Sequence, residues 1–103
     1  MFRGCQDIIE FDFTNFDTSE VTIMADMFFN CYYITSLNLS NFKTSKVYEF
    51  GFMFYNCQSL TSLNLSNFDI SNLRRLEYMF GRCINLEYIN IQKFWRTNNY
   101  IRL

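Results

Sequence analysis

Apolar residues recur along the chain in two successive patterns. Within 34–57, the residues Leu37-Asn38-Leu39 alternate between apolar and polar, as a short strand with one buried face requires. Farther along the same stretch, apolar residues are spaced by three or four positions, which is typical of one face of a helix. This helical spacing is shown by Val21, Met24, Phe28 and Cys31, and again by Val47, Phe50, Phe54 and Cys57.

The two patterns predict one strand and one helix in each unit of the chain. We expect strands over 8–16 and 86–94, with shorter ones at 37–39 and 63–65, and a first helix over 17–31. A parallel strand reached through a helix needs a crossover, and such crossovers are right-handed in nearly all proteins. The sequence therefore predicts an α/β fold, a right-handed solenoid with a short parallel sheet on the concave side and helices on the convex side. Side-chain oxygens that could cap these helices belong to Ser19, Ser45 and Ser71.

The whole pattern repeats at an offset of 26 residues without insertion or deletion. A fixed period of this length is typical of a stacked array, in which each unit buries its apolar face against its neighbours. We expect a single domain over 1–103 built from about four units. Because no polar end unit precedes Asp7, either the chain is a piece of a longer array, which we favour, or its ends are covered by another molecule. The units are 8–33, 34–59, 60–85 and a partial unit 86–103, and the residues in register include Cys5, Cys31, Cys57 and Cys83 as well as Phe16, Phe42, Phe68 and Phe94.

The residues Ile34-x-x-Leu37-x-Leu39 resemble the core of a leucine-rich repeat, and the next unit carries the same motif from Leu60 to Leu65. The complete unit is similar to the repeats of BspA-like leucine-rich repeat surface proteins. Phe42 and Phe68 stand where many leucine-rich repeats have Asn, so we expect a phenylalanine spine in place of an Asn ladder. The resemblance implies a leucine-rich-repeat solenoid in a cell-surface or secreted protein that acts in adhesion.

The charge of the chain excludes some partners and suggests another. The net charge is −1, which does not favour nucleic acid or a polybasic membrane contact. No apolar run is long enough for a signal peptide or a membrane span, so we predict no direct membrane insertion by this segment and see no targeting signal. The stretch 1–35 is acidic and 71–103 is basic. This asymmetry is either a drift of solvated surface charge or the basis of head-to-tail self-association.

The residue types that carry most catalysis are missing or badly spaced. The chain has four cysteines and no histidine, without the close Cys pairs of a zinc site and without a base to activate a thiol. Copies of one helical position would lie roughly 8 to 10 Å apart, beyond the limit of about 7 Å between the Cα atoms of a disulfide. We therefore predict buried, reduced cysteines, no metal, no cofactor and no enzymatic activity.

The outward face of the predicted strands is the candidate binding surface. Strands lie about 4.8 Å apart in a sheet, so one polar residue from each unit should form a straight ladder. Such a face suits a protein or glycan ligand, although Asn and Ser can also simply solvate an open sheet. The candidate ligand-binding residues are Asp12, Ser36, Asn38, Ser40, Ser62, Asn64, Ser66, Tyr88 and Asn90.

Two functions of different classes fit these observations. The first is a non-catalytic recognition or adhesion module of a surface or secreted protein, which binds a protein or a glycan through the ladder. The second is an intracellular structural or scaffold protein of the cytoplasm, which the reduced cysteines and the lack of a targeting signal favour.

Overall fold

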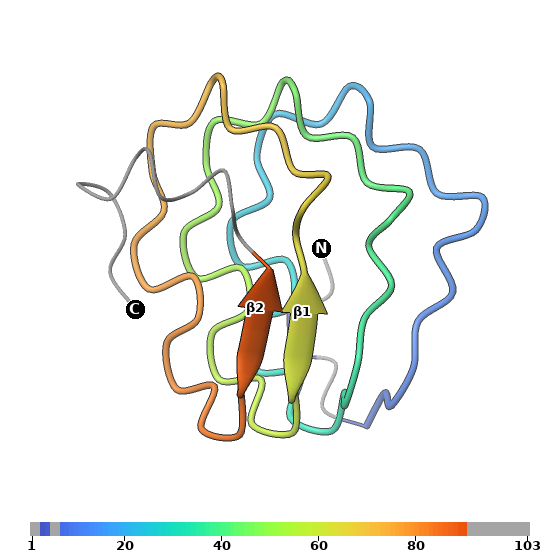
Figure 1. The fold of residues 1–103 in the computed structure, drawn as a ribbon, viewed down its shortest axis with the longest axis vertical. Helices are drawn as coiled ribbons and strands as arrows, with labels where there is room; N and C mark the ends of the chain where they lie inside the picture. Colours follow the sequence, from blue (N-terminus) through green and yellow to red (C-terminus); the bar gives the residue numbers. More distant parts are fainter. Residues whose placement is uncertain (1–2, 5–6, 91–103) are drawn as a thin grey trace.

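The structure is a computed structural model that describes residues 3–4 and 7–90. Its two strands are β1 (Ser62–Asn64) and β2 (Tyr88–Asn90), which pair in parallel (Figure 1). Ser62 lies opposite Tyr88 and Asn64 opposite Asn90, so the register equals the 26-residue period of the sequence. The predicted last strand continues past Asn90 into residues outside the described ones.

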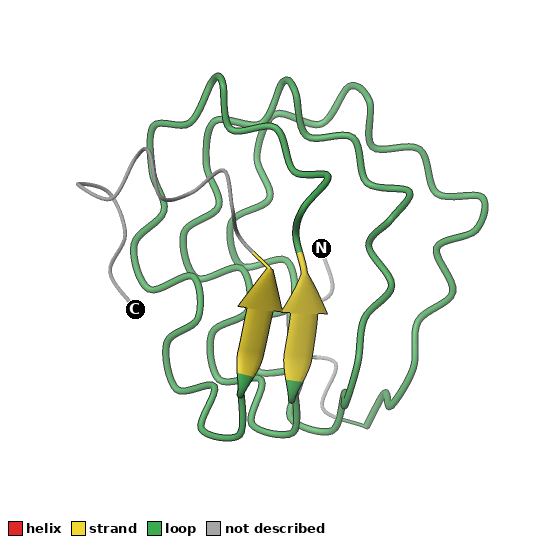
Figure 2. Cartoon of the chain, viewed as in Figure 1, coloured by secondary structure: helices red, strands yellow, loops and turns green. Residues whose placement is uncertain are grey.

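The predicted α/β solenoid is wrong. None of the described residues is helical. Apart from β1, β2 and the isolated parallel bridges of Glu49 with Ile23 and with Arg75, the described chain consists of turns and irregular segments (Figure 2). The molecule measures 33 × 29 × 19 Å. It is a compact body, and its described part contains no helix. The predicted right-handed leucine-rich-repeat solenoid of about four repeats, with helices on a convex side, is therefore wrong. The wider prediction of a repeat-protein architecture is wrong as well.

A chain of tight turns takes the place of the predicted helix over 17–31. The N–H of Met27 donates to the carbonyl of Met24 at 3.3 Å, and the N–H of Cys31 donates to that of Phe28 at 3.1 Å. The third residue of each turn has a positive φ, which a right-handed helix cannot contain. Because one turn also advances the chain by three residues, its buried positions mimic helical spacing. The positive φ values are 60° at Asp26, 62° at Asn30, 58° at Phe52, 64° at Asn56, 55° at Tyr78 and 58° at Arg82.

The backbone of these turns is bound to the next unit of the sequence. The N–H of Phe28 donates to the carbonyl of Met53 at 2.8 Å, and the N–H of Phe54 donates to that of Met79 at 2.9 Å. Every second residue of the segment bonds in this way, which satisfies main-chain groups that a helix would have paired internally. Other main-chain hydrogen bonds have the same offset in sequence between donor and acceptor. Named with the N–H donor first, they join Met24 to Glu49, Asp26 to Gly51, Asn30 to Tyr55, Phe50 to Arg75, Phe52 to Glu77 and Asn56 to Gly81.

The predicted helix caps are absent for the same reason, and polar turns stand in their place. The N–H of Ser19 donates to Oδ1 of Asp17 at 2.9 Å, and the N–H of Ser71 donates to Oδ1 of Asp69 at 2.9 Å. An aspartate that accepts a hydrogen bond from the residue two positions later forms an Asx turn. These serines therefore act as donors in turns and cap no helix.

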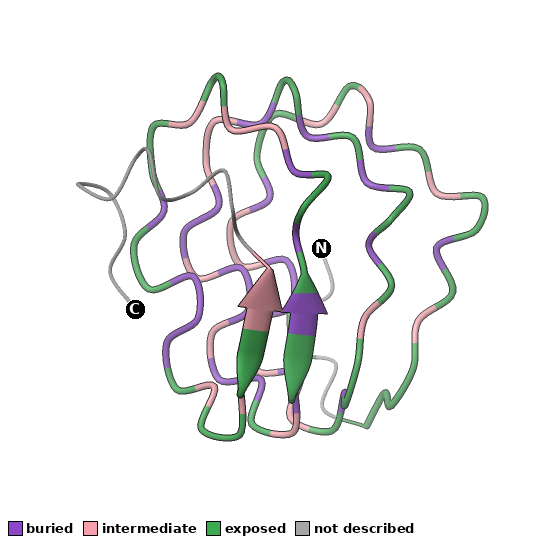
Figure 3. Cartoon of the chain, viewed as in Figure 1, coloured by how far each residue is buried: buried purple, intermediate pink, exposed green. Residues whose placement is uncertain are grey.

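Buried positions recur along the described chain (Figure 3), and at some of them aromatic rings form two stacked columns in the core. Phe42 and Phe68 are buried, with ring centroids 6.4 Å apart and planes inclined by 5°, which confirms the predicted phenylalanine spine at these two positions. In a second column, Phe54 lies between Phe28 and Phe80, with centroids 5.6 and 5.8 Å away. Ring pairs of this kind contribute about 0.5 to 1.5 kcal/mol beyond the area they bury.

A third column lies at the surface and depends on a glycine. The rings of Phe29 and Tyr55 stack at 5.0 Å, and a Cβ atom on Gly81 would lie 2.6 Å from the Tyr55 ring. We expect Gly81→Ala to displace this ring and to lower the free energy of unfolding by about 1 kcal/mol through loss of the stack. The change should be measured by urea denaturation. In a Tyr55→Ala background the same glycine substitution should cost clearly less, because only the Tyr78 carbonyl oxygen, 3.3 Å from the added Cβ atom, then remains close, and an equal cost there would contradict the explanation.

Candidate functional site

The predicted binding residues lie on the outer surface above the core. Eight of the nine are exposed, and Asn90 is half-buried. The residues between them, such as Leu39, Leu63 and Leu65, are buried, so the chain alternates between outside and inside here. The exposed residues are Asp12, Ser36, Asn38, Ser40, Ser62, Asn64, Ser66 and Tyr88.

Short turns fix the orientation of the ladder side chains. Oδ1 of Asp12 accepts the N–H of Thr14 at 2.9 Å, and Oδ1 of Asn38 accepts the N–H of Ser40 at 3.1 Å and its hydroxyl at 2.7 Å. Asn64 repeats the arrangement with the residue two positions later. The Nδ2 groups of Asn38 and Asn64 donate to none of the described residues, which leaves them free for a ligand.

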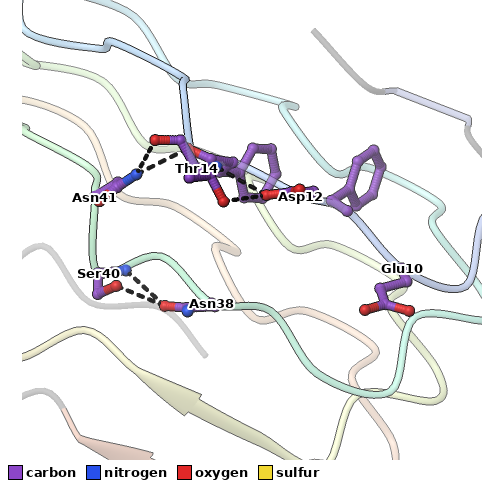
Figure 4. A pocket seen from close by; sticks show the side chains of 8 residues that line it. Glu10, Asp12, Thr14, Asn38, Ser40 and Asn41 are labelled. Atoms are coloured by element: carbon purple, nitrogen blue, oxygen red, sulfur yellow. Dashed lines mark hydrogen bonds between the residues drawn. The ribbon is translucent and has the colours of Figure 1, made fainter.

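Two grooves run between neighbouring units on this surface. The larger has a volume of about 400 Å³ and lies between residues 10–14 and 38–41. The smaller, of about 150 Å³, lies between 37–40 and 64–67. Asn38 and Ser40 line both grooves, so they form the shared wall. Figure 4 shows the turn of Asp12 on one side of the larger groove and the turn of Asn38 on the other.

Two asparagines that the sequence analysis missed hold the groove walls together. Nδ2 of Asn41 donates to the carbonyls of Phe13 and Thr14, at 2.9 Å in each case (Figure 4). Nδ2 of Asn67 donates to the carbonyl of Leu39 at 3.1 Å. These residues directly precede the spine phenylalanines and recur at the 26-residue period, which is the signal that could have identified them. Asn41 and Asn67 thus recur one position before the place where the leucine-rich consensus has Asn, and they are distinct from the ladder of Asn38 and Asn64.

The two walls of the larger groove differ in charge. Glu10 and Asp12 lie on one wall, whereas Asn38, Ser40 and Asn41 on the other are uncharged. The hydroxyl and the N–H of Thr14 bind the Asp12 carboxylate and lower its pKa below the usual value of 3.8. Asp12 is therefore ionised at neutral pH, and the groove is anionic on one side.

The described cysteines are buried or half-buried, and two of them are poor nucleophiles. Cys31 and Cys57 are buried, as predicted, and Cys83 is half-buried. The thiol of Cys57 donates to the carbonyl of Phe28 at 3.2 Å, and burial raises its pKa far above the usual range. Burial also raises the pKa of Cys83 to about 11. The thiolate is the reactive form, so these thiols stay unreactive at neutral pH. The helix on which their predicted spacing rested is absent, and Cys5 lies outside the described residues.

Two kinds of feature are absent from the described part of the chain. Its His, Cys, Asp and Glu side chains form no group of three or more that could hold a metal ion. No helix in residues 3–4 or 7–90 is long and apolar enough to cross a membrane.

Comparison with known proteins gives a family. A family model described as "Mycoplasma protein of unknown function, DUF285" matches residues 1–102. The chain belongs to the DUF285 family. No curated protein matches this DUF285 chain, and no solved structure matches it. The family description gives no activity.

Proposed function

We propose that this DUF285 chain is a non-catalytic recognition module that binds a protein or a glycan in its polar grooves. The observation that carries the proposal is the groove of about 400 Å³ between two units, with exposed polar side chains on both walls. Binding sites are usually concave and contain a few well-placed polar groups. The ladder residues meet this description in successive units of the chain.

The chemistry of the walls suits a ligand rich in hydrogen-bonding groups. Asn38 offers an amide donor, Ser40 a hydroxyl and Asp12 a second carboxylate oxygen. The turns already fix these side chains, so binding would immobilise few rotatable bonds and would lose little affinity to ordering. Sugar hydroxyls and peptide main chains both provide the complementary donors and acceptors.

The resemblance to BspA-like leucine-rich repeat surface proteins supports a place on the cell surface or in the secreted fraction, and a role in adhesion. An impermeant protease applied to intact cells should cleave the full-length gene product within this segment. Cleavage confined to lysed cells would instead favour the cytoplasmic scaffold.

Substitution of Asn38 and Asn64, two residues of the polar ladder, tests the binding proposal. We expect the double variant Asn38→Lys and Asn64→Lys to reduce capture of any ligand found on an immobilised panel of glycans and extracellular-matrix proteins by at least about tenfold. The reason is that two amide donors are lost, each worth about 1 kcal/mol, and that two long side chains fill the grooves. Surface plasmon resonance provides the measurement.

The control for this test adds the same kind of side chain elsewhere. Asn15 is exposed and lines neither groove, so Asn15→Lys should leave capture unchanged. Circular dichroism should show the same fold for both variants, whereas the double variant should melt at a somewhat lower temperature, because Asn38 and Asn64 each lose the oxygen that accepts an N–H group in an exposed turn. The proposal fails if the wild-type chain captures nothing on the panel, or if the double variant captures as well as the control.

A further inference from the structure

We propose that residues 8–12, with the larger groove beside them, dock an extended cationic peptide segment of a partner protein. The inference rests on the proposed function and names the ligand class for one end of the polar surface. Three independent features of this edge support it: its main chain, its apolar side chains and its charge.

The main chain of this edge is unpaired among the described residues. In Figure 1 the segment lies at the outer side of the row that includes β1, with 36–40 as its neighbour. The N–H and carbonyl groups of Ile8, Ile9 and Glu10 form no hydrogen bond with any described residue, whereas β1 and β2 are paired. An unpaired edge of this kind is a template for an added strand, whose main chain supplies the hydrogen bonds.

Two large aliphatic side chains are exposed on the same edge. Ile8 is 40% exposed and Ile9 is 68% exposed, and they are consecutive in the sequence. The residues that follow alternate, with Glu10 and Asp12 on the outer face and Phe11 on the inner face. An added strand whose own residues alternate in the same way would cover Ile9 with its apolar face.

The charge of this end selects a cationic occupant. Residues 7–32 contain six acidic residues and no lysine or arginine, and of the six Asp26 is paired with Arg3 and Glu20 with Lys46. Glu10 and Asp12 both line the groove, and no ion pair to either carboxylate exists among the described residues. Opposite charges facing each other across paired strands stabilise the pairing, whereas an anionic segment would be repelled. The occupant that fits all three features alternates lysine or arginine with aliphatic residues. The acidic residues of this stretch are Asp7, Glu10, Asp12, Asp17, Glu20 and Asp26.

The test uses a fluorescein-labelled peptide of alternating lysine and valine and the full-length chain, measured by fluorescence anisotropy at low ionic strength. An alternating glutamate and valine peptide controls for apolar binding, and a lysine and valine peptide with alternate N-methyl groups controls for main-chain pairing. The groove variant is Glu10→Gln with Asp12→Asn. It retains the fold because Asn at position 12 keeps the oxygen that binds Thr14, as Asn38 does for Ser40.

A variant with the same change in net charge serves as the matched control. Glu77→Gln with Glu87→Gln removes two exposed carboxylates that do not line the groove. We expect the groove variant to bind the lysine peptide about tenfold more weakly than the wild type, since each exposed charge contributes up to about fivefold. The control variant should change affinity less than about twofold, and the N-methylated and glutamate peptides should bind far more weakly than the lysine peptide.

Three results would overturn the inference. They are equal affinity of the groove variant and its control, equal binding of the glutamate peptide, and sedimentation that shows a second copy of the chain occupying the edge. If one of these occurs while Asn38→Lys with Asn64→Lys still abolishes capture on the panel, the cationic ligand is wrong and the proposed function stands. If the wild-type chain captures neither the peptide nor any panel member, both fail together.

Discussion

Replacing Phe54 by alanine is expected to lower the free energy of unfolding by about 3 to 5 kcal/mol. The side chain is fully buried and lies between the rings of Phe28 and Phe80, almost parallel to both, with interplanar angles of 7° and 2°. Its removal would leave a cavity in the middle of the column and break two ring contacts at once. Urea denaturation followed by circular dichroism gives the value.

The neighbouring residue provides the control. Tyr55 is half-buried and stacks on Phe29 at the surface, so Tyr55→Ala should cost clearly less than the change at Phe54. A loss below about 1 kcal/mol for Phe54→Ala would show that the column is not buried, because surface substitutions have effects of that size.

Replacing Thr44 by valine is expected to lower the free energy of unfolding by about 2 kcal/mol. Thr44 is only 1% exposed, and its hydroxyl donates to the carbonyl of Asp69 at 3.1 Å and accepts the N–H of Asp69 at 2.7 Å. Valine fills nearly the same volume, so the change removes two hydrogen bonds without opening a cavity. A polar group left without a partner in the interior costs about 1 to 3 kcal/mol.

The same substitution at an exposed threonine should have almost no effect. Thr61 is exposed, and its main-chain groups rather than its hydroxyl bind the neighbouring units. We expect Thr61→Val to change the free energy of unfolding by less than about 0.5 kcal/mol. Equal losses at the two positions, measured by urea denaturation, would contradict the role of the Thr44 hydroxyl.

The sequence predicted those features that depend on which residues recur at the period. The burial of Phe42 and Phe68 follows from their regular placement, and the parallel pairing of β1 with β2 follows from the 26-residue offset. The outward placement of the Asn38 ladder follows from simple alternation with buried leucines. Each of these predictions needs only the period and the polarity of single positions.

The helices could not be excluded by the same reasoning. A series of three-residue turns buries Met24, Met27 and Phe28 at spacings that a helix would also bury. The deciding difference is the positive φ at Asp26 and Asn30. Asn tolerates a positive φ, so its presence is a weak indication of this conformation. In later units, however, aromatic residues also have a positive φ, and no residue preference predicts that.

The two grooves could not be predicted from the sequence either. Their residues were predicted as an outward ladder, but the pattern does not say where neighbouring units separate enough to leave a cavity of about 400 Å³. The spacing depends on side chains such as Asn41, whose bonds to Phe13 and Thr14 join the units at one end of the groove. Contacts of this kind form between units, so periodicity within one unit does not reveal them.

The central claim is that the main chain of each unit bonds to the next unit and forms no helix. An NMR experiment that detects couplings across hydrogen bonds, the long-range HNCO, tests it directly on the full chain. We predict cross-peaks from the amide nitrogen of Phe28 to the carbonyl carbon of Met53, and from Phe54 to Met79. Cross-peaks from these amides to the carbonyls four residues earlier in the chain would instead show a helix and would contradict the account.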